Sequence, residues 1–336
     1  TVWSWPFLEY TGEQGSGKSA QIKFLWKCCG RDYEGMDPNK STKRGVFRFL
    51  EQMSNLPAVL LEGDHSNIFS PDILKNLYDG GEIRTMGQNT GGNHTRNPTF
   101  RGGVLISQNN EVDGQEATLA RIVHCNCTKE HFSAEGEAAG LRLQEMPIEE
   151  LSGFLHHVLG MESKLLPAYF EAYAQVEERF KVHTHLQNRI RQNHAQVAAW
   201  AWLLPMIFDG QIGAQYVESI EHWLLTRAED RQRRLGADHP LVQRFWEQVD
   251  YITTVMSRDS ANRGLDHSKN PEFIAINMPH FRQVSQQFLQ EPIRDEDIKS
   301  HLKSSRRHEF VAIRTVFSAI ENKNVSCWVF RKGHGA

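Results

Sequence analysis

The stretch that decides the fold reads Gly12-Glu-Gln-Gly-Ser-Gly-Lys-Ser19. It follows a short apolar run, Pro6–Thr11, and precedes a stretch with helical spacing, Ser19–Cys29. The segment therefore matches G-x-x-x-x-G-K-[ST] between a strand and a helix, which is the context that a phosphate-binding P-loop requires. Glycines permit positive φ and close backbone approach, so that successive N–H groups can surround phosphate oxygens.

Each type of side chain in this loop has an expected role. Gly12, Gly15 and Gly17 let the backbone approach the phosphates, and the following helix presents its positive end to them. We expect Lys18 to reach the β- and γ-phosphates of a nucleoside triphosphate and the Ser19 hydroxyl to ligate Mg²⁺. The sequence thus predicts ATP and Mg²⁺ as ligands.

Two acidic residues follow the next buried-strand pattern. Pro57–Leu61 is a short apolar run between breakers, and Glu62 and Asp64 come directly after it. In a P-loop enzyme one acid would hold Mg²⁺ through water, and the other would polarise the attacking water. The sequence leaves open which of the two is the base.

Two more strand patterns, Gly102–Ser107 and Ala120–Cys127, carry further candidates. Asn109 follows the first and could orient water against the γ-phosphate, although polar residues are also ordinary after strands. Arg121 opens the second and is either a surface charge or a group that stabilises phosphate charge in a neighbouring subunit. With helical stretches at Val46–Met53 and Pro71–Tyr78, this region reads as α/β with a mostly parallel sheet.

The remainder of the chain changes character. Residues 146–258 have helical spacing, with expected helices at Ile148–Leu159, Lys164–Gln192, Ala195–Phe208 and Gln215–Arg234. Ser257–Pro271 reads as a linker. A C-terminal module follows, with expected helices at Phe281–Leu289, Asp295–Ser304 and Glu309–Ile320 and a strand at Asn324–Arg331, which suggests a winged helix. We predict domains at 1–130, 131–258 and 271–336.

Taken in order, these elements resemble the superfamily-3 helicases of viruses, phages and plasmids, which are AAA+ ATPases. Gly12–Ser19 looks like their motif A, Leu60–Asp64 like motif B, and Gly102–Asn110 like motif C, with Asn109 as its Asn. Leu74–Gly92 is similar to their B′ element, which leads into a hairpin, and Arg121 falls where the family has its arginine finger. In motif B, Gly63 separates two acids that are usually adjacent in the family.

The resemblance also carries expectations about assembly and partners. It implies a hexameric ring, and Ile274–Phe330 looks like the tail of primase–helicase proteins of phages and integrative elements. In those proteins a primase-type domain lies upstream, which would fit a chain that begins with Thr1 rather than Met. We therefore expect DNA, further copies of the chain and an upstream primase domain as partners.

Basic side chains mark two candidate DNA-binding places. Arg84, His94, Arg96 and Arg101 accompany the B′ segment, where they could hold a single strand's backbone. A C-terminal set could contact phosphates or form a solvated face, and it comprises Lys299, Lys303, Arg306, Arg307, Arg331 and Lys332.

Composition limits the remaining possibilities. The 336 residues are 39% hydrophobic, which does not indicate disorder, and no apolar run reaches the ~18 residues of a membrane span. Five cysteines show neither a disulfide framework nor zinc-ligand spacing, so a cytosolic setting is expected. The leading hypothesis is a DNA helicase, and the alternative is an ATP-switched initiator that assembles on DNA without unwinding it. A small-molecule phosphotransferase lacks an acceptor site.

Overall fold

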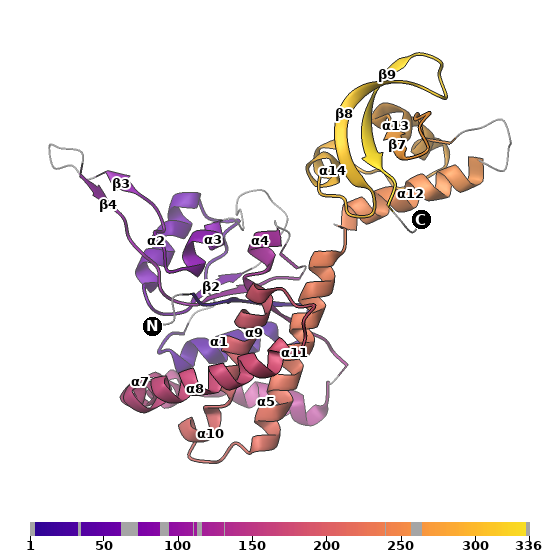
Figure 1. Ribbon diagram of the computed structural model, residues 1–336. Helices are drawn as coiled ribbons and strands as arrows, with labels where there is room; N and C mark the ends of the chain where they lie inside the picture. Colours follow the sequence, from indigo (N-terminus) through magenta and orange to yellow (C-terminus); the bar gives the residue numbers. More distant parts are fainter. Residues whose placement is uncertain are drawn as a thin grey trace. The chain divides into compact units, whose positions relative to one another are not determined.

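A computed structural model describes residues 4–32, 35–61, 73–87, 94–109, 111–112, 116–130, 132–238, 240–256 and 264–333 (Figure 1). The chain forms two compact units, Thr1–Arg233 and Arg234–Ala336. Within the described residues, none of the helices combines the length and the apolar character that crossing a membrane requires.

A four-stranded parallel sheet forms the centre of the first unit. Its strands are β1 (Phe7–Gly12), β2 (Ala58–Leu61), β5 (Val104–Ser107) and β6 (Ile122–Cys127), in the order β2-β5-β1-β6. Met36 adds a single parallel bridge beside β2. All four strands were predicted from short apolar runs, and their parallel pairing confirms the α/β prediction for this region.

Helices cover both faces of this sheet (Figure 1). One face carries α2, α3 and α4, and the other carries α1 and the helical region. The bounds are α1 (Lys18–Cys28), α2 (Lys43–Met53), α3 (Ile73–Tyr78) and α4 (Glu116–Leu119). Phe7, Phe100 and Ile122 lie fully buried in the resulting core.

A short hairpin extends from the first unit (Figure 1). Its strands, β3 (Met86–Gly87) and β4 (Thr95–Arg96), pair antiparallel, with Met86 opposite Arg96. The hairpin expected after Leu74 is therefore present.

The helical region of the first unit is more divided than the sequence predicts. Its helices are α5 (Ala134–Glu145), α6 (Ile148–Leu151), α7 (Gly153–Gly160), α8 (Glu162–Lys181), α9 (Asn188–Ala201), α10 (Leu204–Ile207) and α11 (Ala214–Gly236). The prediction of one helix over Lys164–Gln192 is wrong. A turn intervenes between α8 and α9, and it is held because Leu186 is buried and its N–H donates to the carbonyl of His183.

The second unit has the element order helix, strand, helix, helix, strand, strand. These elements are α12 (Pro240–Met256), β7 (Phe273–Ile276), α13 (Met278–Gln287), α14 (Asp295–Leu302), β8 (Glu309–Phe317) and β9 (Asn324–Arg331). The strands form an antiparallel sheet in the order β7-β9-β8. Phe245 and Trp246 of α12 pack against Phe281 and Phe330, so α12 shares the core of this unit. The three-domain division stays a prediction.

One predicted element of the second unit has the wrong type. Glu309–Ile320 was expected to be helical, but Glu309–Phe317 is strand β8, paired along its length with β9. Val311, Ile313 and Val316 are β-branched, and such side chains favour the pleated conformation when a partner strand is available. The predicted strand Asn324–Arg331 is confirmed with the same bounds.

Candidate functional site

The P-loop lies at the carboxyl end of β1. Strand β1 ends at Gly12, and α1 begins at Lys18, so the loop joins an inner strand of the parallel sheet to a helix. Ligands of open parallel sheets bind beyond the carboxyl ends of the strands. The predicted phosphate site therefore lies at the edge of the sheet where such ligands bind.

The glycines of the loop are required by its backbone. Gly12 has φ +135°, and a Cβ there would lie 2.1 Å from the carbonyl oxygen of Cys127. Gly15 and Gly17 have φ +80° and +87°, a region that other residues rarely adopt. The loop can form only because these three positions carry no side chain.

The polar groups of the loop fit a phosphate group. Lys18 Nζ donates to the carbonyl oxygens of Gly12 at 2.5 Å and Glu13 at 3.0 Å, so the ammonium is held against the loop backbone. Gly17 caps α1 without any side-chain hydrogen bond to the first turn. The Ser16 hydroxyl oxygen is buried and has no partner within the described part of the chain. Unpartnered donors at a helix N-terminus are what a bound anion satisfies.

The predicted magnesium ligands are only partly described. Strand β2 ends at Leu61, opposite Ser107 of β5, but Glu62 and Asp64 lie outside the described residues. Ser19 is exposed at the start of α1. Among the residues that the structure describes, no group of three His, Cys, Asp or Glu side chains could hold a metal ion. The roles of the two acids stay predictions.

The end of β5 brings Asn109 to the P-loop edge. Ser107 pairs with Tyr10, and the Gln108 N–H donates to the Tyr10 carbonyl at 3.1 Å. Asn109 follows and is exposed, whereas Gln108 is buried and its amide donates to Glu9 at 3.3 Å. Since β5 and β1 are parallel, the predicted water-orienting amide lies on the same edge as the phosphate loop.

Arg121 lies at the opposite edge of the sheet. Its carbonyl accepts the N–H of Phe7 at 3.0 Å, and Gly12 lies five residues farther along β1. At about 3.3 Å per residue the two places are about 17 Å apart, beyond the reach of one side chain. The Arg121 guanidinium instead donates to the Ala117 carbonyl and lies over the ring of Tyr78. Arg121 cannot serve the P-loop of its own chain.

A buried polar network beside the P-loop escaped the sequence analysis. Glu9 in the middle of β1 is fully buried, and its carboxylate accepts from Arg231 of α11 at 3.2 Å, from the Val112 N–H at 2.5 Å and from Gln108. The available signal was a single acid inside an otherwise apolar strand. Its partner Arg231 is 222 residues away and could not be identified from spacing.

A neutral histidine adjoins this network. His124 Nε2 lies 2.6 Å from the Thr11 hydroxyl, on neighbouring strands. Burial, with the added charges of Arg231 and Arg227, lowers the pKa of His124 to about 3. Residue Thr11 directly precedes the P-loop, so this contact fixes the strand end from which the loop starts.

Of the predicted DNA-contacting residues in the first unit, three are exposed. His94, Arg96 and Arg101 lie on or beside the β3–β4 hairpin. Arg84 is different, because its Nε is 2.7 Å from a carboxylate oxygen of Glu51 and both side chains are largely buried. Contact between Arg84 and DNA would compete with this ion pair.

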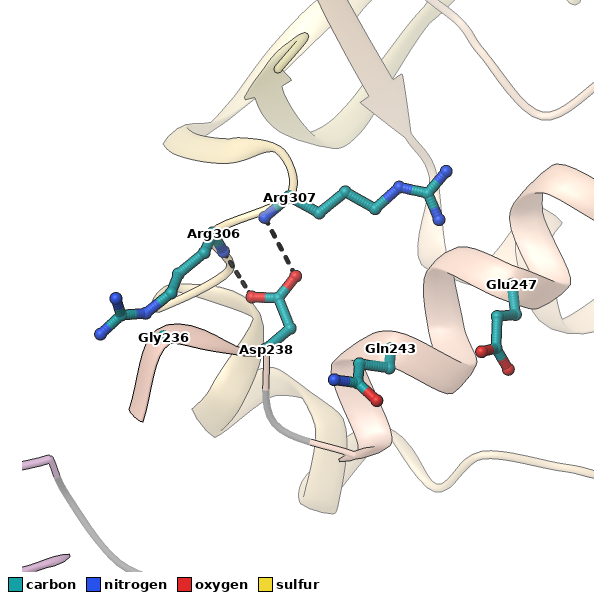
Figure 2. A pocket seen from close by; sticks show the side chains of 6 residues that line it. All are labelled: Gly236, Asp238, Gln243, Glu247, Arg306 and Arg307. Carbon is teal, nitrogen blue, oxygen red and sulfur yellow. Dashed lines mark hydrogen bonds between the residues drawn. The ribbon is translucent and has the colours of Figure 1, made fainter. Parts of the chain in front are cut away.

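The C-terminal arginines border a hollow of about 430 Å³ in the second unit (Figure 2). The Asp238 carboxylate accepts the backbone N–H groups of Arg306 and of Arg307, the latter at 3.0 Å. The Arg307 side chain forms an ion pair with Asp250 at 2.6 Å. Asp238 therefore fixes the backbone from which both predicted DNA-contacting side chains extend.

All five cysteines are free thiols, which agrees with the absence of a disulfide pattern in the sequence. Burial is the largest influence on Cys125, and it raises the pKa of this thiol to about 12. Cys327 is buried, and the other four are partly buried.

Comparison with known proteins rests on the fold, because no protein-family profile and no curated protein matches the sequence. The active helicase Cch of SCCmec type IV is similar, with a TM-score of 0.54 and 12% identity over 99% of this chain and 62% of that one. The NrS-1 C-terminal region in its apo A form has a TM-score of 0.27 and 11% identity, over 98% of this chain and 66% of that one. JCV helicase with a bound thiazolopyridine compound has a TM-score of 0.26 and 14% identity, over 74% of this chain and 56% of that one.

The chain thus spans 62% of the length of the Cch helicase structure. At 12% identity the likeness concerns the fold, and the weaker two matches add nothing to it. The parallel sheet with its covering helices is therefore a helicase-like α/β fold.

Proposed function

We propose that this chain is an ATP-dependent DNA helicase of the superfamily-3 type that acts as a ring. The observation that carries the proposal is the separation of Arg121 from the P-loop by the length of β1. In this proposal Arg121 contributes to hydrolysis in the site of a neighbouring subunit, and head-to-tail contacts of this kind form a ring when their rotation closes. The helicase-like fold supports the same assignment.

In this proposal each predicted residue has one role. Lys18 and the loop amides bind the triphosphate, and Ser19 with Glu62 and Asp64 provides the oxygen ligands of Mg²⁺ and the base. Asn109 orients the attacking water, and Arg121 of the adjacent subunit neutralises charge on the transferred phosphate. ATP supplies the free energy for unwinding.

Two surfaces are proposed to bind DNA. The β3–β4 hairpin with His94 and Arg96, together with Arg101 that follows it, would contact the backbone of a single strand in the pore. The element order and antiparallel sheet of the second unit support a winged helix, whose Arg306 and Arg307 would contact duplex DNA. A primase-type domain is also proposed as a partner.

Strand displacement tests the proposal. A forked duplex with both single-stranded tails is incubated with the full chain, Mg²⁺ and ATP, and release of one strand is followed. The wild-type chain should hydrolyse ATP and release the strand, whereas Lys18→Ala should do neither because the charge on the β- and γ-phosphates is lost. A wild-type chain that hydrolyses no ATP would reject the assignment.

The second candidate function is an ATP-switched initiator. One observation favours it: the second compact unit carries basic residues and has the element order helix, strand, helix, helix, strand, strand. In the same assay, ATP-dependent assembly on duplex DNA with hydrolysis but without strand release would identify this function.

A further inference from the structure

Two arginines from different parts of the first unit lie over one tyrosine ring. The guanidinium of Arg121 is 5.1 Å from the ring centre of Tyr78, and that of Arg189 is 5.9 Å from it. Arg121 precedes β6, whereas Arg189 is the second residue of α9. The sequence analysis considered Arg121 and gave Arg189 no role.

The pair forms without any carboxylate between its members. Neither Arg121 nor Arg189 forms an ion pair within the described part of the chain, and the exposed Asp79 offsets only part of the charge on Arg121. Burial, and next the charge of Arg189, lower the pKa of Arg121. The buried Nε of Arg121 has no hydrogen-bond partner in this part of the chain. Two neighbouring guanidinium groups without an ion-pair partner in this part of the chain are suited to an anion with several oxygens.

The ring that carries the two arginines is held rigidly. Tyr78 is buried, and its hydroxyl donates to Asn193 Oδ1 at 2.6 Å. The Asn193 amide donates in turn to the Ala120 carbonyl at 2.9 Å. This fully buried asparagine lies on α9 with Arg189 and bonds to the residue before Arg121, so it fixes the spacing of the two arginines.

We infer that Arg189 is a second phosphate-contacting arginine, which acts together with Arg121 on the triphosphate bound by an adjacent copy of this chain. The inference rests on the proposed function and adds a residue to its composite site. Arg189 is exposed, as a group that serves a neighbour must be. Arg189 lies by the same Tyr78 ring as Arg121, at the end of the sheet away from the P-loop. The P-loop of its own chain is therefore too distant to be its target.

Single substitutions give the first test. Arg189→Ala should lower the maximal rate of ATP hydrolysis by about ten- to hundredfold, which corresponds to losing one hydrogen bond to a charged group. Binding of a fluorescent ATP analogue by the P-loop should not change. The hydrolysis rate of Arg189→Lys should lie between those of Arg189→Ala and the wild type, because an ammonium keeps the charge but lacks the planar guanidinium geometry. Arg233→Ala is the matched control, since Arg233 is an exposed arginine of the same unit. Wild-type turnover in Arg189→Ala would overturn the inference.

Mixing variants tests whether Arg189 acts across the interface. Arg189→Ala mixed with Lys18→Ala should regain activity, because an intact P-loop can then face an intact pair of arginines. Arg189→Ala mixed with Arg121→Ala should stay inactive, because every interface then lacks one of the pair. Recovery in the second mixture would show that Arg189 serves its own chain and would overturn the inference. If the wild-type chain itself hydrolyses no ATP, the proposed function fails first, and the two failures are thereby distinguished.

Discussion

At the scale of single residues, the Glu9–Arg231 pair is the most consequential contact of the first unit. Both side chains are buried, and they connect the strand before the P-loop to helix α11. Removing one member of a buried pair leaves the other charge uncompensated, which costs about 3–5 kcal/mol. Arg231→Met should therefore lower the free energy of unfolding by this amount, as measured by chemical denaturation.

The double variant provides the control for this prediction. Glu9→Gln combined with Arg231→Met removes both charges while Gln keeps an acceptor for the Val112 N–H. The double variant should be more stable than Arg231→Met alone. Additive losses would contradict the account, since they would show that the two residues contribute independently.

His194 should make stability depend on pH. It is buried, its Nδ1–H donates to the Ile190 carbonyl at 2.8 Å, and burial lowers its pKa to about 4. An unfolded histidine titrates near pH ~6.5. Between about pH 6.5 and 4 the unfolded state binds a proton that the folded state does not, so acidification destabilises the fold by up to ~1.4 kcal/mol per pH unit.

Replacing His194 tests this effect. His194→Gln should reduce the fall in melting temperature between pH 6.5 and pH 4.5, and His124 should account for much of the remaining fall. The control is Gln196→Leu, because Gln196 is buried on the same helix and does not titrate. An unchanged pH dependence in His194→Gln would refute the assignment.

Residues with local signals were found from the sequence, and residues with distant partners were not. Gly12 and Lys18 could be predicted because the P-loop is continuous in the chain, and its conformation needs glycine at fixed positions. Glu9 was missed because its partner lies on α11. Arg189 was missed because only folding brings it to the ring that Arg121 also occupies.

At the scale of elements, the β3–β4 hairpin should account for single-strand binding. Arg96 is exposed on β4, and Arg101 is exposed five residues after it in the chain. Each phosphate contact on a single strand contributes about 0.7 to the slope of log affinity against log salt. Neutralising both with Ala should weaken binding of single-stranded DNA and lower the slope of log affinity against log salt by about 1.4. ATP hydrolysis without DNA should persist.

The matched control for the hairpin is Lys129→Ala. Lys129 is a half-exposed cation of the same unit that pairs with Glu13, and it is not part of the hairpin. Its loss should leave the salt slope of single-strand binding unchanged. Normal unwinding by the Arg96 and Arg101 variant would show that the hairpin does not hold the strand.

Strands and helices differed in how well the sequence predicted them. The four central strands were recognisable because strands buried on both faces are continuous apolar runs. Strand β8 was mistaken for a helix because most of its residues are exposed, so its apolar pattern follows no clear period. The separate helices α8 and α9 were merged because the turn between them contains no glycine or proline.

At the scale of the whole molecule, each of the two compact units has its own core. Trp246 is fully buried in the second, where its ring contacts Phe330 and its Nε1–H donates to the Ser305 hydroxyl at 2.9 Å. Trp246→Ala should lower the free energy of unfolding of this unit by about 3–5 kcal/mol. We expect weaker binding to duplex DNA together with unchanged ATP hydrolysis in its absence.

Calorimetry and a second variant check this expectation. The unfolding transition of the second unit should move to lower temperature in Trp246→Ala while the other transition stays in place. Trp223→Ala, which truncates a partly exposed tryptophan of the first unit, should leave duplex binding intact. Loss of ATP hydrolysis in Trp246→Ala would show that the two units depend on each other for folding.

If Arg121 acts on a neighbouring subunit, as proposed, its position at the far end of β1 from Gly12 makes specific activity depend on protein concentration. Under the proposed mechanism an isolated chain has no complete site, and a head-to-tail pair has one site for two chains. An open row always has one site fewer than its number of chains, and only closure gives every chain a site. Turnover per chain should therefore rise from near zero on concentration and level off when the last interface closes, whereas nucleotide binding per chain should stay constant throughout.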